Sequence, residues 1–451
     1  MCLQQSVNRE QRVKPPKKRL PLRAAARWLL LCTLLALPIG TASALFLVLL
    51  GHVTGAFAAH PWLLLLLPIL GFITAYVYQR YGAAARQGMA LILDEAIAPQ
   101  QPIPLRMTFL IAWGTLMTLL GGGSAGIEAT GVQMACGLAD AIGRKLRLTP
   151  QERPILLTTA IAAGFGSIFG TPVAGAIFAV EIIRQGAPCY GALLPSLLCA
   201  VLADRVTTQL WGIPRHTYAH GPLPPIDAGV WLKVAIAGTL FGLVARLFVK
   251  SVQAVRTFAG QHIAHPVLRP FAGGLIVILL TLLVGSRTYN GLGTETVDLA
   301  LLGADIPFFA PFLKIVFTAV TIGFGFIGGE VTPLLFVGAT AGNVLAGLLG
   351  LPAGMMAKLG FTALLAGGTH TPVTGIMIGM ELLGGGTPVY PATACILAYA
   401  FSGARGIYSS STVQPEERVP LRLLLNAMPS TDLPEEAGYM SSGQDLHVRE
   451  R

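Results

Sequence analysis

Charged residues are scarce in this sequence: they make up only 12% of its 451 residues, whereas soluble domains carry about 25%. Hydrophobic residues make up 53% of the chain, and the mean hydropathy is +0.67. This balance excludes a soluble multidomain protein. Uncharged runs of about 20 residues, which suffice to cross a bilayer as a helix, recur along the chain, beginning at residues 28–50. The sequence therefore predicts a polytopic membrane protein.

Motifs for metal or covalent chemistry are missing as well. The six cysteines form no Cys-x-x-Cys pair and are interpreted as small packing residues, not as a disulfide framework or zinc site. There is no His-Glu-x-x-His sequence, and the eight histidines show no motif at membrane depth. We therefore expect neither an enzyme nor a cofactor or metal site. A cleavable signal peptide is not expected either, because no small-residue cleavage site follows a short apolar core.

The charges that are present lie unevenly. Lysine and arginine number 31 against 21 aspartates and glutamates, and eight basic residues lie between Arg9 and Arg27, before the first span. The positive-inside rule places such a segment in the cytoplasm, so residues 1–27 are expected to form a basic cytoplasmic arm. Anionic lipid accounts for this arm, and no nucleic-acid partner is expected. Residues 411–451 are expected to form a short polar cytoplasmic tail without a regulatory domain.

Glycine and proline interrupt many of the apolar segments. The chain has 53 glycines and 31 prolines, and they break up the stretches 87–98, 164–172 and 367–372. Such segments are too short or too broken for simple spanning helices. Irregular backbone at membrane depth is tolerated only where it faces protein or a water-filled cavity. The pattern therefore predicts broken and re-entrant helices.

The chain also repeats itself. The sequence TPVAG at residues 171–175 recurs as TPVTG at 371–375, and each copy is followed at the same interval by a glutamate, Glu181 or Glu381. Both glutamates stand at the far ends of their apolar segments, so we interpret them as helix caps or as side chains that reach the membrane surface.

A second pair of segments repeats at nearly the same interval. In the order of the sequence, Gly126, Glu128 and Thr130 recur as Gly328, Glu330 and Thr332. Two matches in one order predict two homologous transmembrane halves, at residues 28–215 and 216–410. Duplication with glycine- and proline-interrupted segments is typical of transporters whose site lies where the repeats meet, although channels can be built in the same way.

Two acidic residues stand alone at membrane depth. Glu128 is the only ionisable carboxylate in residues 107–139, and Glu330 is the only charge in residues 315–357. A lone acid there costs several kcal/mol and is a functional hypothesis by default. The alternatives are a protonated acid buried between helices and an acid in an aqueous vestibule.

A glycine-rich stretch precedes each of these glutamates, at residues 121–126 and 323–329, and a helix can begin directly after it. A helix start offers free N–H groups and the positive end of the helix dipole, which together favour an anion. A carboxylate could occupy the anion position when charged and leave it when protonated. This arrangement would couple proton movement to anion movement.

These residues resemble the CLC family of chloride channels and proton-coupled anion antiporters, over residues 28–410. The sequence GIEAT, which begins at Gly126, resembles the second anion motif of the family. The resemblance implies that Glu128 is the gate and proton carrier and that Gly126, Ile127 and Ala129 bind the anion. The sequence GIY, which ends at Tyr408, resembles the C-terminal tyrosine motif, whose hydroxyl coordinates the anion.

The departures from the family pattern point to one branch. Where the first motif should hold a serine, the sequence QGMAL at residues 87–91 places Met89. The third motif is replaced by GGEVTP, which contains Glu330, Val331 and Thr332. Both replacements resemble the fluoride-exporting branch, and the resemblance implies that these four residues bind the anion.

Two positions leave the proton route open. Chloride/proton antiporters carry an inner glutamate directly after the position that matches Glu181, but Ile182 stands there. The fluoride branch also lacks that acid. Phe336, beyond Glu330, is interpreted either as a residue that lines the pathway or as a core aromatic.

The resemblance implies an all-α membrane protein of the CLC type, with about 17 or 18 helical segments in two inverted repeats. It also implies a homodimer with one pathway in each subunit. The expected function is export of fluoride across the plasma membrane in exchange for protons. A chloride/proton antiporter and a passive chloride channel remain open as alternatives.

Overall fold

The computed structural model describes residues 22–183, 190–215, 225, 227–382, 384 and 388–408. Most of the predicted basic arm and all of the predicted tail lie outside these residues. The described chain contains sixteen α-helices and no β-strand, which confirms the all-α prediction. The first eight are α1 (Leu22–Ala59), α2 (Leu67–Val77), α3 (Met89–Ile97), α4 (Arg106–Leu120), α5 (Glu128–Lys145), α6 (Arg153–Phe169), α7 (Pro172–Ile183) and α8 (Leu193–Arg205). The others are α9 (Ala228–His262), α10 (Leu268–Val284), α11 (Thr294–Leu302), α12 (Ala310–Gly323), α13 (Val331–Leu349), α14 (Ala353–Thr369), α15 (Pro372–Leu382) and α16 (Val389–Phe401).

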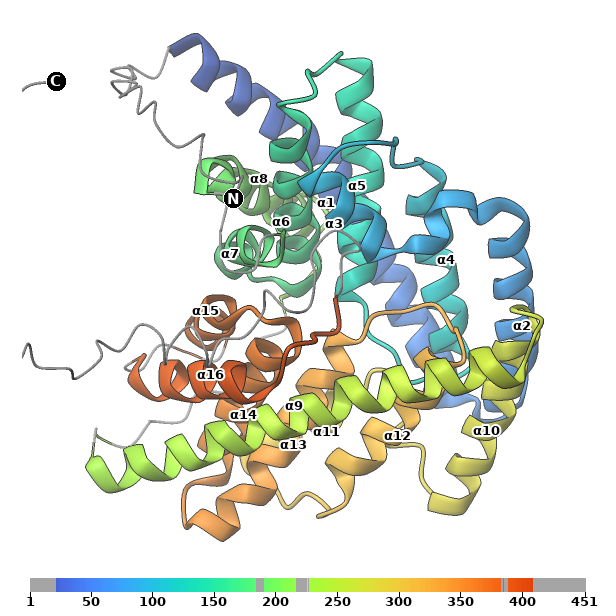
Figure 1. The fold of residues 1–451 in the computed structure, drawn as a ribbon, viewed down its shortest axis with the longest axis vertical. Helices are drawn as coiled ribbons and strands as arrows, with labels where there is room; N and C mark the ends of the chain where they lie inside the picture. Colours follow the sequence, from blue (N-terminus) through green and yellow to red (C-terminus); the bar gives the residue numbers. More distant parts are fainter. Residues whose placement is uncertain are drawn as a thin grey trace, which may run out of the picture. The chain divides into compact units, whose positions relative to one another are not determined.

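The chain contains both long and short apolar helices. Among the residues that the structure describes, five helical stretches are long and apolar enough to cross a membrane, and seven further apolar helices have only 10–17 residues. The longest single helices are α1 and α9, and α9 runs across the other helices of the second half (Figure 1). This mixture of complete and partial spans is the polytopic, broken-helix architecture that the sequence predicts.

The helix breaks fall at the glycine- and proline-rich positions. Helix α6 ends at Gly170 in the left-handed conformation (φ 75°), and Pro172 opens α7. The second half repeats this turn with His370 (φ 60°) and Pro372. Proline suits a first helical position because its missing N–H has no partner there in any case. A histidine in the left-handed region is strained where the equivalent glycine is not.

The two halves contact each other through equivalent helices. Helix α7 packs on α15, α2 on α10, and α5 on α13. The Glu181 carboxylate accepts hydrogen bonds from the N–H groups of Val373 (3.0 Å) and Thr374 (2.8 Å), at the start of α15. Glu381 accepts from Val173 (3.2 Å) and Ala174 (2.9 Å), at the start of α7. The prediction of capping is confirmed, and each cap belongs to the opposite half.

Candidate functional site

Glu128 begins α5 with its side chain almost fully buried, at 2% exposure. Its carboxylate accepts hydrogen bonds from the N–H groups of Ile127 and Thr332, both at 3.2 Å. The hydroxyl of Thr332 lies 2.8 Å from both carboxylate oxygens. Because Thr332 lies in the first turn of α13, the carboxylate bridges equivalent helix starts of the two halves.

The glycine loops bring these helix starts together. Gly126 and Gly329 exchange two backbone hydrogen bonds, each of 2.7 Å. A Cβ atom on Gly126 would lie 2.5 Å from the Thr332 hydroxyl oxygen, so only glycine fits there. The sequence predicts Gly126 as an anion ligand, but its N–H is already donated to Gly329. In this structure the Gly126 N–H is therefore paired with the opposite half.

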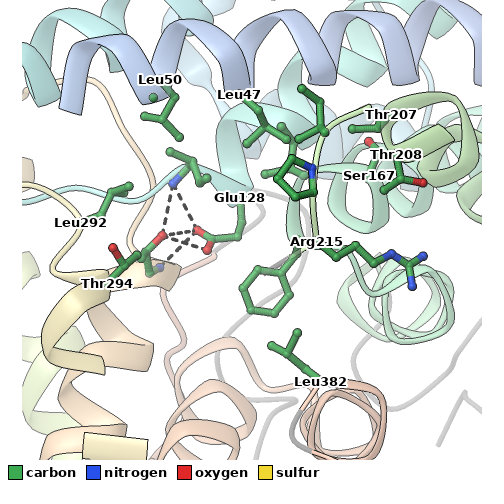
Figure 2. A pocket seen from close by; sticks show the side chains of 18 of the residues that line it. Leu47, Leu50, Glu128, Ser167, Thr207, Thr208, Arg215, Leu292, Thr294 and Leu382 are labelled. Atoms are coloured by element: carbon green, nitrogen blue, oxygen red, sulfur yellow. Dashed lines mark hydrogen bonds between the residues drawn. The ribbon is translucent and has the colours of Figure 1, made fainter. Parts of the chain in front are cut away.

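A pocket of about 650 Å³, called the Glu128 pocket below, lies on one side of the carboxylate. Its walls include Ile127, Glu128, Thr332, Leu50, Thr294 and Arg215. Figure 2 shows the hydrogen-bonded Glu128 side chain beside this space, with Leu50 above it and Arg215 across from it. Arg215 forms an ion pair with the buried Asp204, so its charge is matched within the pocket wall.

A second pocket, of about 360 Å³, is called the Met89 pocket below. Its walls include Gly88, Met89, Ala129, Gln133, Arg256, Gly329, Glu330 and Tyr408. The structure thus brings together four residues that the sequence proposes as anion ligands and that lie far apart in the chain: Met89, Ala129, Glu330 and Tyr408. Glu128 and its chain neighbour Ala129 line different pockets, so the start of α5 stands between the two spaces.

The sequence suggests that Glu330 is isolated, but in the structure it has a partner. Its carboxylate lies 3.1 Å from the guanidinium of Arg256, which α9 carries to the start of α13. Arg256 is 74 residues away in the chain, so the expectation of an unpaired acid is wrong. The side chain of Arg256 is 57% exposed, whereas that of Glu330 is 12% exposed. The ion pair therefore links the less exposed Glu330 carboxylate to the more exposed Arg256 side chain.

Two proposed residues lie in the core. Val331 and Phe336 are fully buried and line neither of the two pockets. Phe336 lies below the ammonium group of Lys314, which is 4.9 Å from the ring centroid. In this structure Phe336 packs as a core aromatic beside Lys314 of α12.

Lys314 is a buried lysine that belongs to none of the motifs in the sequence. It donates hydrogen bonds to the carbonyl oxygens of Gly291 (2.8 Å) and Tyr289 (3.2 Å). The loop that contains Tyr289 and Gly291 also contacts the glycine stretch before Glu128. Asn290 Nδ2 and the Gly291 N–H both donate to the carbonyl oxygen of Gly122, at 3.0 and 3.2 Å. Its signal in the sequence is that Lys314 is the only charged residue within α12.

The chain is all-α and duplicated, and a buried carboxylate lies between two pockets. This combination is typical of membrane transporters and channels that are built from repeats. Residues 70–403 match the model of the family described as voltage gated chloride channel. The chain belongs to this family, the CLC family, and is a multi-pass membrane protein.

Individual relatives cover most of the chain. A protein of Pseudomonas syringae pv. tomato named chloride/fluoride channel protein is 41% identical over 395 residues, which cover 86% of this chain and 87% of that protein. The crystal structure of a CLC-type fluoride/proton antiporter superposes with a TM-score of 0.83 at 32% identity, covering 87% of this chain and 98% of that one. A slow cyanobacterial Cl⁻/H⁺ antiporter shares the fold, with a TM-score of 0.71 at 20% identity over 83% of this chain and 94% of its own.

Proposed function

We propose that this protein is a fluoride/proton antiporter that exports fluoride, with Glu128 as its gate and proton carrier. The observation that carries the proposal is the position of the Glu128 carboxylate. It occupies the two helix starts, held by the Ile127 and Thr332 N–H groups and the Thr332 hydroxyl. A negatively charged carboxylate competes with an anion for these donors, whereas a protonated one competes weakly. Proton uptake by Glu128 would therefore open the way for the anion.

The relatives and the departures from the family pattern support fluoride as the anion. The relative that is 41% identical is named for chloride and fluoride, and the structure that is 32% identical is titled a fluoride/proton antiporter. In the Met89 pocket, a methionine stands where the family motif has a serine hydroxyl. A thioether is at best a weak acceptor and donates no hydrogen bond to an anion. Chloride therefore loses a ligand there, while fluoride, the stronger acceptor, can still use other donors.

The ion pair at the start of α1 supports an orientation in the membrane. Arg27, the last residue of the basic arm, lies 2.7 Å from Glu152 in the loop between α5 and α6. That loop therefore lies on the side of the arm, and Glu128 lies at the other end of α5. With the arm in the cytoplasm, the Glu128 pocket faces outward. We also propose cytoplasmic termini, the plasma membrane as location, repeats at residues 28–215 and 216–410, and a homodimer.

The test is transport by purified protein in liposomes loaded with fluoride or chloride, with anion efflux and proton uptake recorded together. Fluoride/proton antiport predicts fluoride efflux that drives protons inward. Glu128→Gln should abolish the proton movement. The matched control is Glu295→Gln, the same change at an exposed carboxylate of α11, which should transport normally. Proton-coupled efflux of chloride in preference to fluoride would favour a chloride/proton antiporter, and anion efflux without protons would favour a passive channel.

A further inference from the structure

Gln133 is a buried amide that faces the Met89 pocket. It lies on α5, five residues after Glu128, and is 5% exposed. Its side chain makes no hydrogen bond to another residue within the described part of the chain. The amide atoms of Gln133 are not enclosed by protein, so their open side is the one that faces the pocket. An unpaired amide that lines a pocket is therefore positioned for something that the pocket holds.

The amide lies beside an uncapped helix start. Gly88, with a φ of 57°, directly precedes α3, and no side chain caps this helix. A Cβ atom on Gly88 would lie 3.7 Å from Gln133 Oε1, so the amide group reaches the beginning of α3. The first N–H groups of a helix have no partner inside it and favour an anion. The oxygen and nitrogen of an amide are distinguished only by their partners, so the NH₂ group can equally face the pocket.

The two arginines of this pocket are already paired, whereas the Tyr408 hydroxyl is a second neutral donor in its wall. Arg256 is paired with Glu330. Arg86 donates hydrogen bonds to the carbonyl oxygens of Tyr78 and Gln79 and is turned back on its own segment. Met89 has no donor. Gln133 is thus a neutral donor next to the position where the sequence lacks the expected serine.

We propose that the Gln133 amide donates a hydrogen bond to the fluoride ion in the Met89 pocket and thereby replaces the missing serine hydroxyl. The proposal rests on the proposed function and adds one ligand to the anion site in the Met89 pocket. A buried donor is left poorly paired when a weak acceptor binds, and this lowers the affinity for that ion relative to a strong acceptor. Fluoride is the smaller ion and the stronger acceptor, so the amide favours it over chloride.

The experiment compares wild-type protein with Gln133→Met, which keeps the length of the side chain and removes the donor. Fluoride binding to detergent-purified protein is measured by calorimetry, and the half-saturating fluoride concentration is measured in liposomes. One hydrogen bond to a charged group corresponds to roughly tenfold or more in affinity, so Gln133→Met should raise both constants by about that factor. The ratio of protons to fluoride should not change, because Glu128 is intact.

Two further variants make the result specific. Thr130→Val removes a buried hydroxyl from the same helix, where it bonds to Thr115 (2.8 Å), but Thr130 lines neither pocket and fluoride affinity should stay unchanged. Gln133→Glu keeps the shape and makes the donor titratable, because the protonated acid donates a hydrogen bond and the carboxylate does not. Its fluoride affinity, compared with the wild-type protein at each pH, should fall as the pH rises, even if Gln133→Met does not fold.

The outcomes separate the two proposals. Wild-type affinity in a folded Gln133→Met variant, or a Gln133→Glu variant that follows the wild-type affinity at every pH, would overturn the role of Gln133 and leave fluoride/proton antiport intact. Absence of fluoride binding and flux in the wild-type protein would instead overturn the proposed function, whatever the variants do.

Discussion

Replacing Thr332 by valine tests how the gate carboxylate is held. The Thr332 hydroxyl lies 2.8 Å from both oxygens of Glu128, and valine keeps the shape of the side chain while removing this donor. A hydrogen bond to a charged group contributes about 1.5–3 kcal/mol. At about 1.4 kcal/mol for each factor of ten, the charged carboxylate should leave its position roughly ten to a hundred times more readily.

The expected effect is loss of coupling, not loss of transport. The N–H groups of Ile127 and Thr332 remain and still offer a site for an anion. An anion should therefore displace the carboxylate without waiting for its protonation. In liposomes, Thr332→Val should release fluoride with fewer protons taken up per ion than the wild-type protein. Thr332→Ser keeps the hydroxyl and should retain the wild-type ratio.

The refuting result is equally concrete. If Thr332→Val has the size-exclusion profile of the wild-type protein and also its ratio of protons to fluoride, the hydroxyl does not hold the gate. A lowered ratio in Thr332→Ser as well would show that the hydroxyl alone does not hold the gate, because serine keeps that donor.

Three further predictions concern neighbouring groups. Met89→Ser restores a hydroxyl donor to the Met89 pocket and should raise chloride flux relative to fluoride flux in liposomes. An unchanged flux ratio would show that other residues determine selectivity. Arg256→Gln leaves the Glu330 carboxylate without its ion pair and should lower fluoride flux several-fold at neutral pH, whereas Arg256→Lys keeps the charge and should retain most of it. Lys314→Met leaves the carbonyl groups of Tyr289 and Gly291 unpaired, at about 1–3 kcal/mol each. It should lower the unfolding temperature in detergent, and an equal unfolding temperature would contradict the role of Lys314 in holding that loop.

Local chemistry explains why much of this fold could be predicted from the sequence. The turn at Gly170 and Pro172 needs a left-handed residue followed by a proline, and both are visible in the sequence along with their repeat. The helix start at Glu128 is likewise marked by the glycines before it. Features that depend on a few adjacent residues leave a direct trace in the order of the amino acids.

Contacts between distant helices left no such trace. Arg256 meets Glu330 because α9 crosses the second half, and nothing near either residue encodes the angle of that helix. Gln133 was overlooked because a glutamine within a helix has no distinctive pattern; its burial and its empty surroundings appear only in three dimensions. The pairing of the Gly126 N–H with Gly329 is likewise a contact between the halves that the motif around Gly126 does not encode.

The exchanged caps of Glu181 and Glu381 have a consequence for the ancestry of the chain. Each half contributes the carboxylate that the other half needs at a helix start, as in a two-fold dimer in which residue i meets residue j and j meets i. Before the gene doubled, two separate copies of one half could have made these same contacts. Fusion then added a linker between partners that were already complementary. The two halves, made as separate polypeptides, should therefore assemble with each other.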